Sequence, residues 1–193
     1  MRAAAPLTAA CIAAALALAA TGAAAKPVVV ASSVLYPVVG STESELRRSL
    51  DQSPLSPDGK RRVGYTQADI RWQYEARERK GKCRVVSVTV TLTSKTTLPQ
   101  WAAPPGAPRA LRERWTAFLD ALTAHEQGHS DIALAAAQRI EDALWHAPMP
   151  RTCTGYSTRL DAMANELFDD AIRRQEAYDA ETDYGRAQGV RFP

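Results

Sequence analysis

Two histidines and a glutamate lie in the middle of a long stretch with helical periodicity, and no other segment constrains the fold as strongly. The segment reads His-Glu-Gln-Gly-His over residues 125–129 and holds two of the three histidines of the chain. A step of four residues along an α-helix returns to the same face, so we expect both imidazoles to point in one direction. Two neutral imidazoles held in this way provide half of a tetrahedral zinc site.

Glu126 directly follows the first of these histidines. It lies about 100° further round the helix than His125, which is too far round for it to join the two ligands. It can still reach a water molecule on the open side of a bound metal, the position of the general base in metalloproteases with this motif. Glu126 is therefore the candidate catalytic residue, and His125 and His129 are the candidate metal ligands.

The same motif can also occur by chance on a helix surface that binds no metal. The flanking residues argue against chance, because an apolar stripe at helical spacing runs straight through the two histidines. The members of this stripe are Leu111, Trp115, Phe118, Leu119 and Leu122 before the motif, and Ile132, Ala133, Ala136, Ile140 and Leu144 after it. A pair of histidines that faces the core needs polar partners, and a metal supplies them.

The first 25 residues are expected to be a signal peptide. Arg2 supplies a short positive region, residues 7–20 are an apolar run of mostly alanine and leucine, and alanines at 23–25 fit a cleavage site. We therefore expect one mature domain of residues 26–193, secreted or periplasmic. No stable membrane insertion is expected after cleavage. A lipid anchor on Cys11 is not expected either, because Thr8 occupies the position at which a lipoprotein signal has a branched aliphatic residue.

Two cysteines remain after cleavage, Cys83 and Cys153. An even number of cysteines in an exported protein predicts a disulfide. The chain-entropy model gives a closed loop of roughly 70 residues about 4 kcal/mol of stabilisation. Zinc ligation by these cysteines is the alternative, but neither has a second cysteine at metal-ligand spacing. The net charge is only +3 and no basic stripe is present, which argues against nucleic acid as a partner.

Segments with strand character occupy the first half of the mature chain. Residues 28–39 are β-like and contain Pro37, which predicts an edge strand. Residues 65–74 and 86–93 alternate between apolar and polar positions, and the charged stretch 75–82 between them predicts a hairpin connection. The clearest apolar face is that of the second strand: Val86, Val88, Val90 and Leu92. We expect a small antiparallel sheet with one face packed on helices.

Helices are predicted on both sides of these strands. Thr42 with Glu45 three residues later is a capping box for a short helix. A proline-rich crossing at residues 99–108 leads into a long helix over residues 109–146, and a second long helix begins near Ser157. The fold class that follows is α+β, with the sheet packed on the motif-bearing helix and a second long helix returning beside it.

A catalytic zinc site needs a third protein ligand. His146 is excluded, because it lies about 25 Å beyond His129 on the same helix at 1.5 Å per residue. If the second helix returns antiparallel, residue 174 falls opposite His129 and residue 178 opposite His125. The candidates in this neighbourhood are Glu176, Tyr178, Asp179, Asp183 and Tyr184. Glu166 is a further candidate, although the same count places it about two turns from the metal.

The chain resembles the bacterial predicted secreted zinc-dependent proteases, a zincin-like family of unknown function. The likeness rests on the exported N-terminus, the segment of residues 125–133, and the tail of residues 178–185. It implies a minimal zincin fold. It also implies that Tyr184 stands where the family has a histidine as third zinc ligand. A phenol with an ordinary pKa near 10 is a poorer ligand at neutral pH, so Asp183, Asp179 or Glu176 could be recruited instead.

These observations together predict a zinc metallopeptidase that hydrolyses peptide or protein substrates. Glu126 would take the proton of a zinc-polarised water, and Tyr178 or Tyr184 could donate a hydrogen bond to the oxyanion. The alternative from another class is a non-catalytic periplasmic binding or scaffold protein whose zinc site is structural or degenerate.

Overall fold

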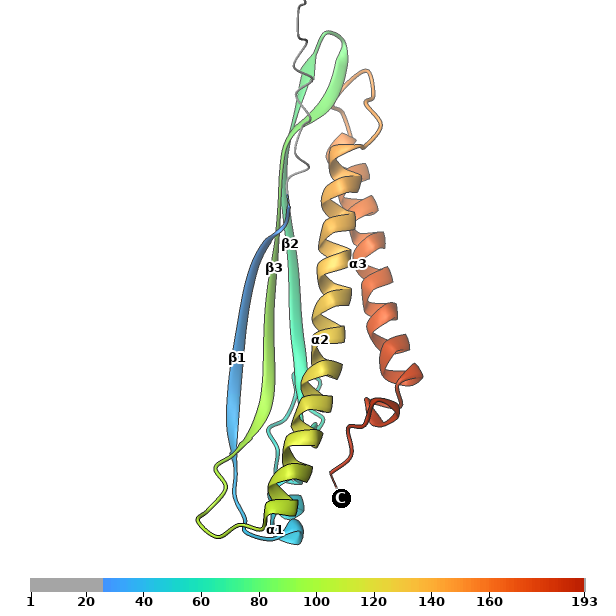
Figure 1. Cartoon of the computed structure of the whole chain (residues 1–193). Helices are drawn as coiled ribbons and strands as arrows, with labels where there is room; N and C mark the ends of the chain where they lie inside the picture. The colour runs from blue at the N-terminus through green and yellow to red at the C-terminus, as the bar shows by residue number, and fades with distance from the viewer. Residues whose placement is uncertain (1–25, 193) are drawn as a thin grey trace, which may run out of the picture.

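The structure is a computed structural model that describes residues 26–192, so the expected signal peptide at residues 1–25 lies outside the described residues. The elements in chain order are β1 (Val28–Val38), α1 (Glu43–Leu50), β2 (Tyr65–Arg79), β3 (Lys82–Trp101), α2 (Arg109–Trp145), α3 (Tyr156–Glu181) and the short 3-10 helix η1 (Arg186–Gln188). The fold is α+β, as predicted. Helices α2 and α3 lie together on one face of the sheet (Figure 1). Within residues 26–192, no helix is both long and apolar enough to cross a membrane.

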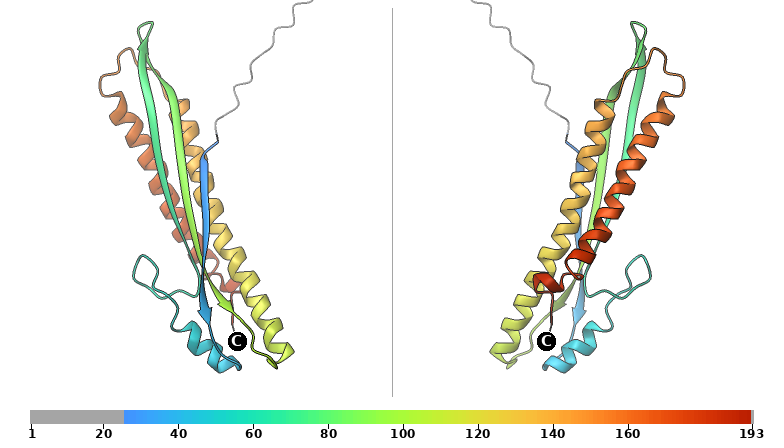
Figure 2. Two further views of the ribbon diagram at one scale, coloured as in Figure 1. Left: turned by 90° about the vertical axis from the view of Figure 1, so that its left-hand side faces the viewer. Right: turned by 90° about the vertical axis from the view of Figure 1, so that its right-hand side faces the viewer.

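The three strands form one sheet in the order β1-β3-β2. Strands β2 and β3 are the predicted antiparallel hairpin, and β1 is the predicted edge strand. Strand β1 runs parallel to β3, however, so the sheet is mixed and the expectation of a purely antiparallel sheet was wrong. The reason is that α1 and the loop of residues 51–64 carry the chain past β3 to its far side, where β2 begins (Figure 2).

Strand β3 departs from its predicted face at one position. Val88, Val90 and Leu92 are buried as predicted, but Val86 is 40% exposed. The pairing with β2 shifts between Glu75 and Ala76, which leaves Val86 as the unpaired residue of a β-bulge. A bulge reverses the facing of the residues beyond it, and so Cys83 turns inward instead. The strand also continues to Trp101, so only the last part of the predicted crossing at 99–108 is irregular.

The helices begin and end close to their predicted positions. Thr42 and Glu45 form the predicted capping box of α1. Helix α2 is continuous over 37 residues, or about 55 Å, and packs against two separate hydrophobic clusters. One cluster contains its residues from Leu111 to Leu122, and the other contains those from Ala133 to Leu144. The two histidines of the motif lie on α2 in the interval between these two clusters.

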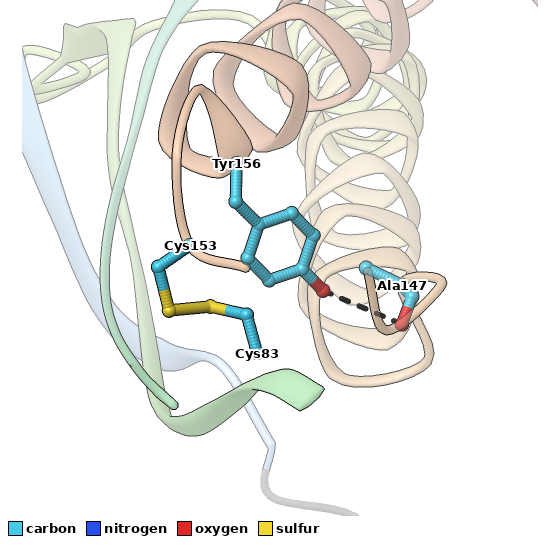
Figure 3. The surroundings of a disulfide bond; sticks show 4 residues. All are labelled: Cys83, Ala147, Cys153 and Tyr156. Atoms are coloured by element: carbon cyan, nitrogen blue, oxygen red, sulfur yellow. Dashed lines mark hydrogen bonds between the residues drawn. A yellow bond between two sulfur atoms is a disulfide. The ribbon is translucent and has the colours of Figure 1, made fainter. Parts of the chain in front are cut away.

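The predicted disulfide is present between Cys83 and Cys153, whose Cα atoms are 5.0 Å apart (Figure 3). It joins the tip of the β2–β3 hairpin to the loop between α2 and α3. The same contact includes a hydrogen bond from the Cys83 backbone N–H to the Pro150 carbonyl at 2.7 Å. The Tyr156 hydroxyl donates to the Ala147 carbonyl beside it, at 3.4 Å (Figure 3). The disulfide therefore closes the end of the molecule opposite α1.

Replacing Cys83 and Cys153 together by alanine is expected to lower the free energy of unfolding by about 4 kcal/mol. The physical reason is the conformational entropy that a cross-link across a sequence separation of 70 removes from the unfolded chain. Urea denaturation of the wild type and of the double variant measures the difference. Equal unfolding midpoints would contradict the expectation.

Candidate metal centre

Helix α2 brings His125 and His129 onto one face, as their spacing predicts. Their ring centroids are 4.9 Å apart, and their side chains are only 6% and 13% exposed. Both therefore sit at the inner side of the helix, in the interval between the two hydrophobic clusters. Neither cluster provides polar groups for them there, so the partners of the imidazoles come from α3 and the tail beyond it.

Helix α3 supplies a carboxylate to this pair. One oxygen of Asp179, Oδ1, lies 3.3 Å from Nε2 of His125 and 3.1 Å from Nε2 of His129. Among the histidine, cysteine, aspartate and glutamate residues of the described chain, these three form the group that could hold a metal ion. The helix count placed residue 178 opposite His125, and the Tyr178 ring does stack on His125 with a centroid separation of 5.0 Å.

A glutamine fixes the tautomer of His129. The Gln175 side-chain N–H donates to the backbone carbonyl of His129 at 2.9 Å, and a carbonyl can only accept. The amide oxygen of Gln175 is therefore the atom that faces Nδ1 of His129, at 2.5 Å. That oxygen can only accept as well, so Nδ1 carries the proton. In the neutral imidazole the lone pair is then on Nε2, the nitrogen that faces Asp179 Oδ1 at 3.1 Å.

A second glutamine holds His125 in the same way. The Gln188 amide oxygen lies 2.8 Å from Nδ1 of His125, and its N–H donates to the Tyr178 hydroxyl at 3.0 Å. The Tyr178 hydroxyl in turn donates to the His125 carbonyl at 3.3 Å. This commits the hydroxyl proton of Tyr178 to the protein. Partners of this kind, which bond the far nitrogen of an imidazole, are the usual second layer of a metal site.

The three candidate ligand atoms lie within 4.8 Å of one another. When both imidazoles are neutral, two lone pairs and a carboxylate oxygen face one another, and a positive charge between them, a metal ion or a proton, removes their repulsion. In a tetrahedral zinc site with bonds of about 2.0–2.1 Å, ligand atoms are about 3.3–3.4 Å apart. The observed separations from Asp179 Oδ1, 3.1 and 3.3 Å, are close to this value. Two imidazoles and one carboxylate also form a common ligand set of catalytic metals.

Glu126 is buried beside the histidines and is only 3% exposed. One of its carboxylate oxygens, Oε2, has no hydrogen-bond partner among the described residues. An unpaired buried polar atom costs about 1–3 kcal/mol, so it calls for a partner such as water or substrate. Burial raises the pKa of this carboxyl group. Glu126 also lines the cavity beside the three candidate metal ligands.

The loop before β2 holds the other oxygen of Asp179. Nη1 of Arg62 lies 3.5 Å from Oδ2 of Asp179, and Nη2 of the same guanidinium lies 3.0 Å from Asp58. The Ser56 hydroxyl donates to Asp58, and together with Arg62 it holds the pKa of Asp58 well below its usual range. Both oxygens of Asp179 therefore have partners: Oδ1 faces the histidines and Oδ2 faces Arg62.

The other proposed third ligands are more exposed than Asp179. Tyr184 lines the same cavity but is 58% exposed, and its role as a ligand stays a prediction. Asp183 is exposed and paired with Arg186 at 2.6 Å. Glu166 and Glu176 are both exposed on α3. Among the carboxylate candidates, Asp179 is the one that lies within 3.3 Å of Nε2 of both histidines.

A family model described as "Bacterial protein of unknown function (DUF922)" matches residues 34–185. The chain belongs to this family. The match extends from within β1 to Gly185 and so includes all three metal-binding candidates and Glu126. Comparison with curated proteins and with solved structures finds no match.

Two glycines of this DUF922 protein allow other residues to pack closely against the candidate ligand His125. A Cβ atom on Gly128 would lie 2.2 Å from the hydroxyl oxygen and 2.4 Å from Cζ of Tyr178. A Cβ on Gly185, which has a φ of +80°, would lie 3.0 Å from Cγ of His125. Gly128 therefore admits the ring that stacks on His125, and Gly185 lets the tail lie against the same imidazole.

Replacing Gly128 by alanine is expected to destabilise the protein, although this change normally favours a helix interior by about 1 kcal/mol. The new methyl group would overlap the Tyr178 ring, and such overpacking typically costs about 1–3 kcal/mol. Thermal unfolding of Gly128→Ala measures the loss. The control is Gly128→Ala combined with Tyr178→Ala, compared with Tyr178→Ala alone, where the added methyl group should no longer be harmful. A raised melting temperature for the single variant would contradict the close contact.

A cavity of about 750 Å³ opens in front of the metal-binding group. Helix α2 provides its floor with His125, Glu126 and His129, and it is walled by the start of β2 on one side and by α3 with the tail on the other. The loop before β2, which includes Arg62, also lines the cavity. The sequence did not indicate that Arg62, Gln175 and Gln188 belong to the site.

Proposed function

We propose that this protein is an exported zinc-dependent metallopeptidase, with His125, His129 and Asp179 as the metal ligands. One observation carries the proposal. The Nε2 atoms of His125 and His129 lie 3.3 and 3.1 Å from one Asp179 oxygen, while both Nδ1 atoms face glutamine amide oxygens. That arrangement leaves three acceptors facing one another, and a bound cation is its simplest completion.

The chemistry divides between the metal and the residues around it. A bound zinc ion would supply Lewis acidity, which polarises a peptide carbonyl and lowers the pKa of water. Glu126, which lines the cavity and has an unpaired buried carboxylate oxygen, would accept the proton of the attacking water and return it to the departing amine. Tyr184, exposed at the same cavity, is the tyrosine whose hydroxyl is available to the oxyanion, because Tyr178 is committed to His125.

The remaining residues of the site have positioning roles in this proposal. Gln175 and Gln188 keep both imidazoles in the tautomer that presents Nε2. Arg62 restrains the second oxygen of Asp179, so that Oδ1 faces the histidines. An open cavity rather than a closed pocket suits a peptide or protein chain as the substrate.

Metal content and hydrolysis test the proposal directly. Mature protein of residues 26–193, recovered from the periplasm and purified without chelator, is expected to contain about one zinc per chain by elemental analysis. It should cleave casein or a mixed peptide digest, as read by mass spectrometry. A chelator should abolish the cleavage, and added zinc should restore it. Protein without bound metal would contradict the centre. Zinc-loaded protein without hydrolysis would favour the non-catalytic binding or scaffold alternative.

A further inference from the structure

The cavity has different chemistry at its two ends. One end is lined by the basic residues of the loop before β2, Lys60, Arg61 and Arg62. The other end is lined by apolar side chains from three elements: Ala68, Ile70, Ala133, Phe168, Ala171 and Ile172. The metal-binding group and Glu126 line the same cavity.

Contacts between β2 and α2 show the order along the cavity. Gly64, at the end of the basic loop, packs against Leu122, one turn of α2 before His125. Thr66 donates to the carbonyl of Glu126 at 3.2 Å. Ile70 belongs to the same hydrophobic cluster as Ala133, which lies two turns of α2 after His125. The basic loop therefore lies on one side of the metal-binding group, and the apolar residues lie on the other.

The apolar end has room for a side chain because small residues meet there. Ala68 from β2, Ala133 from α2 and Ala171 from α3 contribute one methyl group each, while Phe168 stands on α3. Ile172, also on α3, is 45% exposed although it lines this end. An aliphatic side chain of a bound peptide would cover Ile172 and gain hydrophobic stabilisation.

The basic end carries positive charge that its own residues do not fully neutralise. Lys60 and Arg62 share the single carboxylate of Asp58, and the other partner of Arg62 is the proposed metal ligand Asp179. The Arg61 guanidinium donates to the neutral Ser53 carbonyl at 2.6 Å. Within residues 26–192, Arg61 has no ion-pair partner. An anionic group at this end would meet uncompensated guanidinium and ammonium charge.

We infer that the cavity selects peptides with an apolar side chain on one side of the reacting bond and a carboxylate on the other. This inference rests on the proposed peptidase function and names its substrate class. The carboxylate could belong to an acidic side chain or to the C-terminus of a peptide, since both present the same group to Arg61 and its neighbours. The two groups of the peptide would flank the reacting bond because the candidate metal ligands lie between the basic and the apolar ends of the cavity.

Binding to a zinc-loaded Glu126→Gln protein tests the selection without requiring turnover. The probes are fluorescein-labelled peptides containing Leu-Ala-Ala-Glu or the reverse order, Glu-Ala-Ala-Leu, each followed by an amidated Ala-Ala. Matched peptides replace Leu by Ala or Glu by Gln, and a further pair ends in Leu-Ala-Ala with a free or an amidated C-terminus. Fluorescence anisotropy gives each dissociation constant. A peptide with both groups should bind about tenfold or more tightly than either matched peptide.

Variants of each end complete the test. Ile172→Ser, at an exposed position, should remove the preference for Leu over Ala. Arg61→Gln should weaken the preference for the carboxylate, and both variants should keep their zinc content and melting temperature. A stronger effect of the free C-terminus than of the Glu side chain would assign the carboxylate to the chain end, and the opposite would assign it to a side chain. Equal binding of all peptides, or preferences that survive both substitutions, would overturn the inference.

The cleavage assay on wild-type protein separates the two proposals. Selective binding by Glu126→Gln together with no cleavage by the wild type would refute the peptidase function but support the selection. Cleavage by the wild type at sites without either preference would support the peptidase and overturn the selection.

Discussion

Replacing Asp179 by alanine is expected to weaken zinc binding by more than about 100-fold. Even the outer partners of a metal site are typically worth about 10- to 100-fold in affinity, and Asp179 would bind the metal itself. Its Oδ1 atom is the one oxygen that approaches Nε2 of both histidines. A competitive titration with a chromophoric chelator, at neutral pH, measures the affinity of the wild type and of the variant.

The control for this experiment is Tyr184→Phe, which removes only the phenolic oxygen. Tyr184 is 58% exposed, and we expect its loss to change zinc affinity less than about threefold, because Asp179 already completes the ligand set. Strong loss in Tyr184→Phe with little loss in Asp179→Ala would contradict our assignment. It would return the third-ligand position to the tyrosine that the family resemblance pointed to.

The difference between these two residues shows how far sequence reasoning extends. Counting along two antiparallel helices placed residue 178 opposite His125, and the stacked ring of Tyr178 confirms that register. The count works because α2 and α3 are regular up to Glu181. Beyond that point Asp183 and Tyr184 both have a positive φ, 51° and 53°, so the tail turns away from the helix path. Counting residues along α3 can therefore predict the position of Asp179 but not that of Tyr184, which lies beyond the end of the helix.

Much of the fold followed from local patterns, and the exceptions have a common cause. The capping box of α1, the hairpin and both long helices depend on neighbouring residues, which the sequence displays directly. The parallel pairing of β1 with β3 depends on which side of the sheet the chain takes after α1, and no periodic pattern encodes that choice. The bulge at Val86 likewise gave no local signal, because its alternation with Val88 and Val90 looks regular.

The outer residues of the candidate metal centre were not predicted, for the same reason. Gln175 and Gln188 are ordinary polar residues whose roles depend on contacts with α2, and Arg62 comes from a loop folded against α3. One signal was present in the sequence. The apolar stripe of α2 belongs to one cluster up to Leu122 and to another from Ala133 onward, with the histidines between. Such an interval in a buried helix indicates where a polar site interrupts the core.

Replacing Glu126 by glutamine is expected to lower the rate of peptide hydrolysis by about 100- to 10,000-fold, the usual contribution of general acid–base catalysis. Glutamine has almost the same shape but cannot accept the proton of the attacking water. Zinc affinity should change less than about threefold, because Glu126 is absent from the group formed by His125, His129 and Asp179. The measurement is kcat on the best substrate from the cleavage assay, together with chelator competition.

A second buried glutamate on α2 provides the matched control. Glu141 is 3% exposed like Glu126, but it does not line the cavity. Glu141→Gln should therefore leave kcat unchanged. The Glu126→Gln variant should also stay folded, because an uncharged amide is easier to bury than a carboxylate with an unpaired oxygen. If zinc-loaded Glu126→Gln hydrolyses peptides at the wild-type rate, Glu126 is not the base, and another group on the cavity must take the proton.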